Sequence, residues 1–163
     1  MNTRSTQAYI LTGSNLGERD SYLATASRLL EQQLGAAVKK SRIYETAAWG
    51  NTLQAAFLNQ ILVFDTTFEG KKLLDILLSI EKEMGRTRTQ KWAERTIDID
   101  LLMLGDQVIH EEGLEVPHPH MHERRFTLVP MNELASDIIH PLLHKSMAQL
   151  LSECTDILEV NPW

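Results

Sequence analysis

The chain has 163 residues, of which 43% are hydrophobic, and it carries a formal net charge of −6 at pH 7. We expect one domain over residues 1–163, because this length can bury a proper core. The acidic balance argues against a general nucleic-acid surface. The single cysteine, Cys154, excludes an internal disulfide framework and favours a reducing cytosol. No apolar run approaches membrane-spanning length. Taken together, these features lead us to expect a cytoplasmic monomer with neither a membrane nor a nucleic-acid partner.

The first elements along the chain are a strand and a helix. The apolar residues 8–12 predict a short strand that ends at the turn Gly13-Ser14-Asn15-Leu16-Gly17. Apolar spacing then predicts a helix over residues 18–34, with Gly35 as its C-cap. The turn could offer backbone N–H groups to an anion, but the pattern alone favours an ordinary tight turn.

Residues 38–46 and 57–65 predict two further strands, separated by a loop at 47–52. In the second of these strands Phe57 and Asn59 share a face with Ile61 and Val63. An asparagine among apolar neighbours is either a satisfied buried amide or a reader of a flat polar ligand, and the pattern alone favours the buried amide.

A helix over residues 70–84 follows, because its apolar side chains recur at i, i+3 and i+4 and Gly85 stops it. The next segment, residues 86–95, carries four cations and one acid. It is either a solvated basic loop or a segment that binds polyphosphate, and it runs directly into an acidic pair.

That acidic pair lies in a predicted strand over residues 95–104. Alternation puts Asp98 and Asp100 on one face with Leu102 and Leu104, and Ile97, Ile99, Leu101 and Met103 on the other. Neighbouring carboxylates repel, and a hard cation such as Mg²⁺ relieves this repulsion. The alternative is a solvated strand end with two exposed acids. The upstream cations favour the metal, because guanidinium groups and Mg²⁺ neutralise different phosphate oxygens.

The C-terminal part contains less chemistry. Gly105-Asp106 predicts a hairpin return at 108–109, and His118, His120 and His122 alternate, although two prolines and the lack of nearby cysteine argue against zinc. We expect a strand at 126–129, a short helix near 132–135 and an amphipathic helix near 146–153.

The order of all these elements predicts an α+β fold, a ferredoxin-like plait whose largely antiparallel sheet is covered by helices. We expect the loops at 47–56 and 85–95 to be mobile active-site loops.

These motifs together resemble the hydroxymethyl-dihydropterin pyrophosphokinase family. The matching pieces occur in the family's order and span nearly the whole chain. They are Gly13-Ser14-Asn15-Leu16-Gly17, Tyr44-Glu45-Thr46, Phe57-Leu58-Asn59, Ile80-Glu81, Gly85-Arg86-x-Arg88, Trp92-x-x-Arg95-Thr96-x-Asp98-x-Asp100, Val116-Pro117-His118 and Arg124-x-Phe126.

The resemblance implies a reaction in which ATP transfers its β,γ-pyrophosphoryl group to 6-hydroxymethyl-7,8-dihydropterin and leaves as AMP. It implies two Mg²⁺ ions on Asp98 and Asp100. The other implied roles are phosphate contacts for Arg86, Arg95 and His118, closed-state assistance from Arg88 and Arg124, a place in the moving lid for Trp92, and pterin contacts for Thr46, Phe57, Asn59 and Phe126.

The chain departs from the family pattern at three places, none of them in the acidic pair. Ala47-Ala48 occupies a segment that often contains proline, Ala93-Glu94 stands where many members have Gly-Pro, and Pro119 replaces an aromatic residue of some members.

Two alternative functions stay open. One is an Mg²⁺-dependent nucleotidyltransferase, whose Gly-Ser and Asp-x-Asp pieces would lie much closer in sequence. The other is a non-catalytic ferredoxin-like regulatory or RNA-binding module, which the negative charge opposes.

Overall fold

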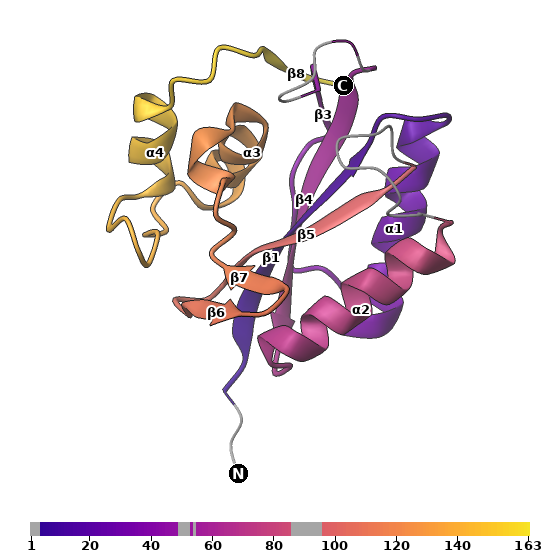
Figure 1. Ribbon diagram of the computed structural model, residues 1–163, viewed down its shortest axis with the longest axis horizontal. Coiled ribbons are helices and arrows are strands. Elements are labelled where there is room, and N and C mark those ends of the chain that lie inside the picture. The colour runs from indigo at the N-terminus through magenta and orange to yellow at the C-terminus, as the bar shows by residue number, and fades with distance from the viewer. Residues whose placement is uncertain (1–3, 49–52, 54, 86–95) are drawn as a thin grey trace.

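The computed structural model describes residues 4–48, 53, 55–85 and 96–163. Within them an antiparallel sheet separates two layers of helices (Figure 1). Its strands are β1 (Thr6–Ser14), β2 (Lys39–Lys40), β3 (Tyr44–Thr46), β4 (Phe57–Thr66), β5 (Asp98–Leu104) and β8 (Val160–Pro162). The helices are α1 (Arg19–Leu34), α2 (Gly70–Glu83), α3 (Arg125–Ala135) and α4 (Met147–Glu153), and a separate hairpin pairs β6 (Ile109–Glu111) with β7 (Leu114–Val116).

The strand order identifies the fold. The chain runs β1-α1-β3-β4-α2-β5, yet the sheet order is β5-β1-β4-β3-β8, with β2 also paired to β4. Two interleaved crossovers of this kind make the ferredoxin-like plait, so the predicted α+β class is confirmed. No helix in the described part of the chain is long and apolar enough to cross a membrane.

Alternating side chains of the sheet fill two separate cores. One core lies under α1 and α2 and includes Leu23, Leu62 and Leu77. The other lies under α3 and α4 and includes Ile61 and Met131. Both helical layers are visible in Figure 1, with α1 and α2 on one side of the sheet and α3 and α4 on the other. The central strand β1 is therefore buried on both faces.

The strand predicted at 126–129 is wrong, because these residues belong to helix α3. Leu128 and Met131, one helical turn apart, both enter the core shared with Met147 and Leu150 of α4. This packing overrides the local preference of an aromatic and β-branched run for extended structure. The short helix predicted near 132–135 is the second half of the same helix.

The strand predicted at 38–46 is broken into β2 and β3. Three residues, 41–43, lie opposite two residues of β4, since Lys40 pairs with Leu62 and Tyr44 pairs with Asn59. At the break the Ser41 hydroxyl oxygen accepts the backbone N–H of Ile61 at 2.9 Å. A side chain thus replaces a backbone acceptor, which interrupts the regular ladder.

A second irregularity lies in β5. Tyr9 pairs with Met103 and Ile10 pairs with Leu101, so Leu102 is an extra residue. Because of the bulge, Met103 and Leu104 face the opposite sides of the sheet from those predicted. Met103 joins the core under α3 and α4, and Leu104 joins the core under α1 and α2. The hairpin return at 108–109 is also corrected, because Ile109 opens β6, which pairs with β7 and not with β5.

Candidate active site

The acidic pair lies upstream of the bulge, so its predicted face is correct. Asp98 and Asp100 are half-buried, whereas the intervening Ile99 is buried in the core under α1 and α2. The paired residue of Asp100 on β1 is Leu11, which belongs to the opposite core. Both carboxylates therefore arise from the sheet face that carries α3 and α4.

Glu81 of α2 holds the backbone between the two aspartates. Its side chain is only 2% exposed, and its Oε2 accepts the backbone N–H of Ile99 at 2.8 Å. Because β5 ends the strand order of the sheet, a carboxylate here stands in for a neighbouring strand. The motif Ile80-Glu81 is among those that carry the resemblance, but the resemblance implied no role for Glu81. The sequence signal for Glu81 is its place four residues after Leu77 and eight after Leu73 on one apolar stripe of the helix, where an acid is unexpected.

The residues predicted to contact the pterin come from β3 and β4. Thr46 pairs with Phe57, and the Thr46 hydroxyl donates to the Glu159 carbonyl at 3.0 Å. Asn59 is 3% exposed, and its Nδ2 has no hydrogen-bond partner among the described residues. Such a buried donor is costly unless something else accepts it. The satisfied buried amide favoured by the pattern is therefore not what these residues form.

His118 approaches the same face from the segment after β7. Its backbone N–H donates to the Leu102 carbonyl of β5 at 2.9 Å. The pKa of His118 is lowered to about 4, chiefly by burial and then by the positive charges of Arg124 and His120, while the negative charge of Asp98 acts in the opposite sense. The Nδ1 of His118 accepts the His120 backbone N–H at 3.2 Å. The imidazole is thus neutral, with its proton on Nε2.

Arg124 and Phe126 mark the beginning of α3. The Cζ of Arg124 lies 5.6 Å from the centre of the Phe126 ring, within the range of a cation–π contact. The three alternating histidines do not converge: the ring of His118 lies 6.1 Å from that of His120, whereas His122 faces His140, also at 6.1 Å.

Four predicted site residues, Arg86, Arg88, Trp92 and Arg95, lie outside the described residues, as do Ala93-Glu94 and residues 49–52 and 54 of the loop at 47–56. Their roles stay predictions. The described segments bring together the acidic pair, His118 and the residues predicted to contact the pterin, all on one sheet face.

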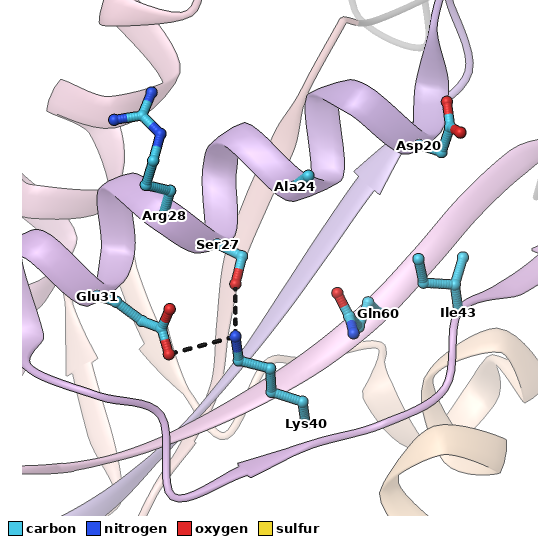
Figure 2. A pocket seen from close by; sticks show the side chains of 8 residues that line it. All are labelled: Asp20, Ala24, Ser27, Arg28, Glu31, Lys40, Ile43 and Gln60. Atoms are coloured by element: carbon cyan, nitrogen blue, oxygen red, sulfur yellow. Dashed lines mark hydrogen bonds and ion pairs between the residues drawn. The ribbon is translucent and has the colours of Figure 1, made fainter.

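A cavity of about 320 Å³ lies elsewhere, between α1 and the strands β2 and β4 (Figure 2). Within it Lys40 Nζ contacts Glu31 Oε1 and donates to Ser27 Oγ, each at 3.2 Å. Gln60, which also lines it, shares a face of β4 with Leu58 and Leu62, which belong to the core under α1 and α2. This cavity is therefore on the face opposite the aspartates and is separate from the candidate site.

Ser14 also belongs to that opposite face. Gly13, its neighbour, pairs with Asp98, so the Gly-Ser turn and the acidic pair are close in space although distant in sequence. However, side chains alternate along β1, and Ser14 is directed away from the carboxylates. The nucleotidyltransferase alternative, which would use both pieces on one side, gains no support from this arrangement.

The fold is an antiparallel plait, and one face of its sheet carries two carboxylates and the amide of Asn59, whose Nδ2 has no partner among the described residues. Neighbouring carboxylates of this kind suit Mg²⁺ and substrate phosphates, so the site is of the class that serves phosphoryl-group chemistry. Residues 9–136 match the model of the family 7,8-dihydro-6-hydroxymethylpterin-pyrophosphokinase. The chain belongs to this family, and its activity is pyrophosphoryl transfer to hydroxymethyl-dihydropterin in folate biosynthesis.

Individual proteins agree with this assignment. The chain is 43% identical to the 2-amino-4-hydroxy-6-hydroxymethyldihydropteridine pyrophosphokinase of Bacillus subtilis over 132 residues, which is 80% of this chain and 79% of that one. It is 40% identical to the Aquifex aeolicus enzyme of the same name, over 90% of this chain and 91% of that one. A Plasmodium falciparum HPPK-DHPS crystal structure with pterin and p-hydroxybenzoate shares the fold, with a TM-score of 0.76 at 16% identity. The match covers 92% of this chain but only 44% of the Plasmodium chain.

Proposed function

We propose that the protein transfers the β,γ-pyrophosphoryl group of ATP to the hydroxymethyl oxygen of 6-hydroxymethyl-7,8-dihydropterin, with release of AMP and with Mg²⁺ held by Asp98 and Asp100. One observation carries this assignment of residues. The carboxylates of β5 lie on the same sheet face as the buried amide of Asn59, whose Nδ2 has no partner among the described residues. Phosphate chemistry and pterin recognition thus have neighbouring sites.

The donors fit Mg²⁺. This ion is usually bound through one or two carboxylates, with water and substrate phosphates completing its octahedron, and Asp98 and Asp100 are both partly exposed on one face. In the described part of the chain, no group of three or more His, Cys, Asp or Glu side chains could hold a metal ion. Phosphate oxygens would therefore complete the coordination of the two ions that the resemblance implies. Bound Mg²⁺ would supply neutralisation of the phosphate charge.

The pterin half of the site consists of an amide and two aromatic rings. Asn59 would donate its Nδ2 hydrogen to a ring acceptor, which removes the cost of an unsatisfied buried donor. Phe57 and Phe126 would stack on the two faces of the ring, since both are only partly buried and so have surface to offer. Thr46 would contribute through its backbone.

His118 would donate a neutral hydrogen bond to a phosphate oxygen. Its Nδ1 is already an acceptor, so Nε2–H is the available donor, and the pKa of about 4 makes it a poor base for the hydroxyl proton. On the resemblance alone, we assign Arg86 and Arg95 to phosphate contacts, and Arg88 and Arg124 to assistance in the closed state. Trp92 is assigned to the lid on the same ground.

The test identifies the product. Purified protein with ATP, Mg²⁺ and hydroxymethyl-dihydropterin should form AMP and pterin diphosphate. An ATP analogue with a methylene between the α and β phosphorus atoms should bind without reacting. Formation of ADP would place attack at the γ phosphorus and overturn the proposal.

The metal assignment has its own variants. Asp98→Asn or Asp100→Asn should lower kcat by at least about 10²-fold, because each removes a ligand of the Mg²⁺ that would neutralise the reacting phosphates. Asp106→Asn, in the exposed turn after β5, is the matched control and should retain activity. Near-normal turnover of either site variant at saturating Mg²⁺ would contradict the assignment.

A cytoplasmic, monomeric enzyme is also part of this proposal. The single cysteine supports a reducing compartment. Light scattering after size-exclusion chromatography should give the 18.6 kDa mass of one chain, and a doubled mass would exclude the monomer.

A further inference from the structure

One row of paired residues crosses three strands at the centre of the candidate site. Asp98 of β5 pairs with Gly13 of β1, and Gly13 pairs with Asn59 of β4. Directly paired residues in an antiparallel sheet face the same way. Strands lie about 4.8 Å apart, so about 10 Å separates the backbones of Asp98 and Asn59. The residue between the metal-binding position and the amide has no side chain.

Space, rather than backbone conformation, requires glycine here. A Cβ at Gly13 would lie 2.7 Å from Asn59 Oδ1 and 3.5 Å from Phe57 Cδ1. Asn59 is 3% exposed, so its amide has little room to move away. In contrast to Gly17 and Gly35, Gly13 does not have a positive φ, and alanine could adopt its extended backbone.

We propose that Gly13 is a positioning residue for the reaction. Its missing side chain lets the Asn59 amide lie against β1 in the orientation that reads the pterin. It also keeps open the space between that amide and Asp98, where the hydroxymethyl oxygen must meet the phosphate. This inference rests on the proposed function, since it needs the pterin at Asn59 and the phosphates at Asp98.

The first variant is Gly13→Ala. Displacing the amide should lower kcat/KM for hydroxymethyl-dihydropterin by about 10- to 100-fold, because a misplacement of about 1 Å can cost about 10²-fold. The Kd of the unreactive α,β-methylene ATP analogue, measured by calorimetry, should change by less than about twofold. A variant whose pterin kinetics match the wild type would overturn the proposal.

A double-mutant cycle isolates the contact with Asn59. Asn59→Ala removes the atom that the new methyl group would meet, so adding Gly13→Ala to it should cost less than about a further twofold in pterin affinity. A purely structural role would instead give the same loss in both backgrounds, and that additivity would overturn the inference. If Gly13→Ala alone unfolds, recovery of Tm and of analogue binding in the double variant supports the contact, and no recovery contradicts it.

Gly70→Ala is the matched control. Its new Cβ would lie 2.6 Å from Ile109 Cδ1, a similarly close approach away from the site. It should lower Tm without a selective loss of pterin affinity. A selective loss in this variant would show that pterin affinity falls with any destabilisation, and the effect of Gly13→Ala would then not support the inference. Wild-type protein that makes no AMP would refute the proposed function itself. Wild-type turnover with an unaffected Gly13→Ala variant would refute only this inference.

Discussion

The charge state of His118 follows from its surroundings at the scale of single residues. Burial and the nearby Arg124 lower its pKa from 6.5 to about 4. Between these two values the unfolded chain binds a proton that the folded chain does not, so stability rises with pH in this interval. The contribution is fully present above about pH 6.5 and is lost as pH falls toward 4. One pKa unit corresponds to about 1.4 kcal/mol, so the loss across the interval from 6.5 to about 4 is at most about 3.5 kcal/mol.

His118→Gln should therefore flatten the pH dependence of stability. Urea unfolding at pH 7, 6 and 5 should show a smaller drop in the free energy of unfolding for the variant than for the wild type. His110→Gln is the control, because the His110 side chain is 85% exposed, and its curve should follow the wild type. Equal slopes for His118→Gln and wild type would show that the folded protein protonates His118 normally.

At the scale of elements, helix α2 supports the strand that carries the acidic pair. Glu81 Oε2 accepts the Ile99 N–H between Asp98 and Asp100. Glu81→Leu would leave that buried N–H without this acceptor, at a cost of about 1–3 kcal/mol. We also expect at least a tenfold (~10×) loss in kcat/KM, because the carboxylates lose their fixed spacing.

Glu81→Gln keeps an acceptor oxygen and should retain most of the activity and of the Tm. Glu83→Leu, at an exposed position of the same helix, is the control and should behave as wild type. Thermal melts and Mg²⁺ titrations of activity measure both effects. If the Gln and Leu variants fail equally, the negative charge of Glu81, and not its acceptor oxygen, is the required property.

At the scale of the whole molecule, polar contacts join the sheet to the α3 layer. The Tyr44 hydroxyl of β3 donates to the Glu133 carboxylate of α3, and Arg42 Nη2 donates to that hydroxyl at 3.1 Å. Burial, followed by the bond to Glu133, raises the pKa of Tyr44, so the hydroxyl remains a donor at neutral pH. These contacts fix α3, whose first turn contains Phe126, against β3, and Tyr44 of β3 pairs with Asn59 of β4.

Tyr44→Phe keeps the ring and removes the hydroxyl. It should lower the free energy of unfolding by about 1–2 kcal/mol, because the Glu133 carboxylate loses one of its donors and keeps only those of Arg42 among the described residues. Pterin affinity should fall a few-fold (~3×) as the layers loosen, while nucleotide-analogue affinity stays constant. Tyr22→Phe, on α1 at the other face, is the control. Equal losses for both ligands, measured by calorimetry, would show that the contact sets overall stability and not the pterin pocket.

The sequence by itself determined the features that depend on local periodicity. Alternation at Ile97, Asp98, Ile99 and Asp100 set which side chains share a face, and i, i+3, i+4 spacing identified the helix now seen as α2. The order of motifs along the chain led to the family that residues 9–136 match. These signals are readable because side-chain direction repeats every 2 or 3.6 residues in strands and helices.

Only the tertiary structure decided the features that join distant segments. The bulge at Leu102, the break at Ser41 and the helical state of residues 126–129 come from pairing or packing with remote elements. The same is true of the acceptor that Glu81 offers to β5 and of the row that places Gly13 between Asp98 and Asn59. Strand register and helix docking are set by non-local contacts, and no local pattern encodes which residues will face each other across strands.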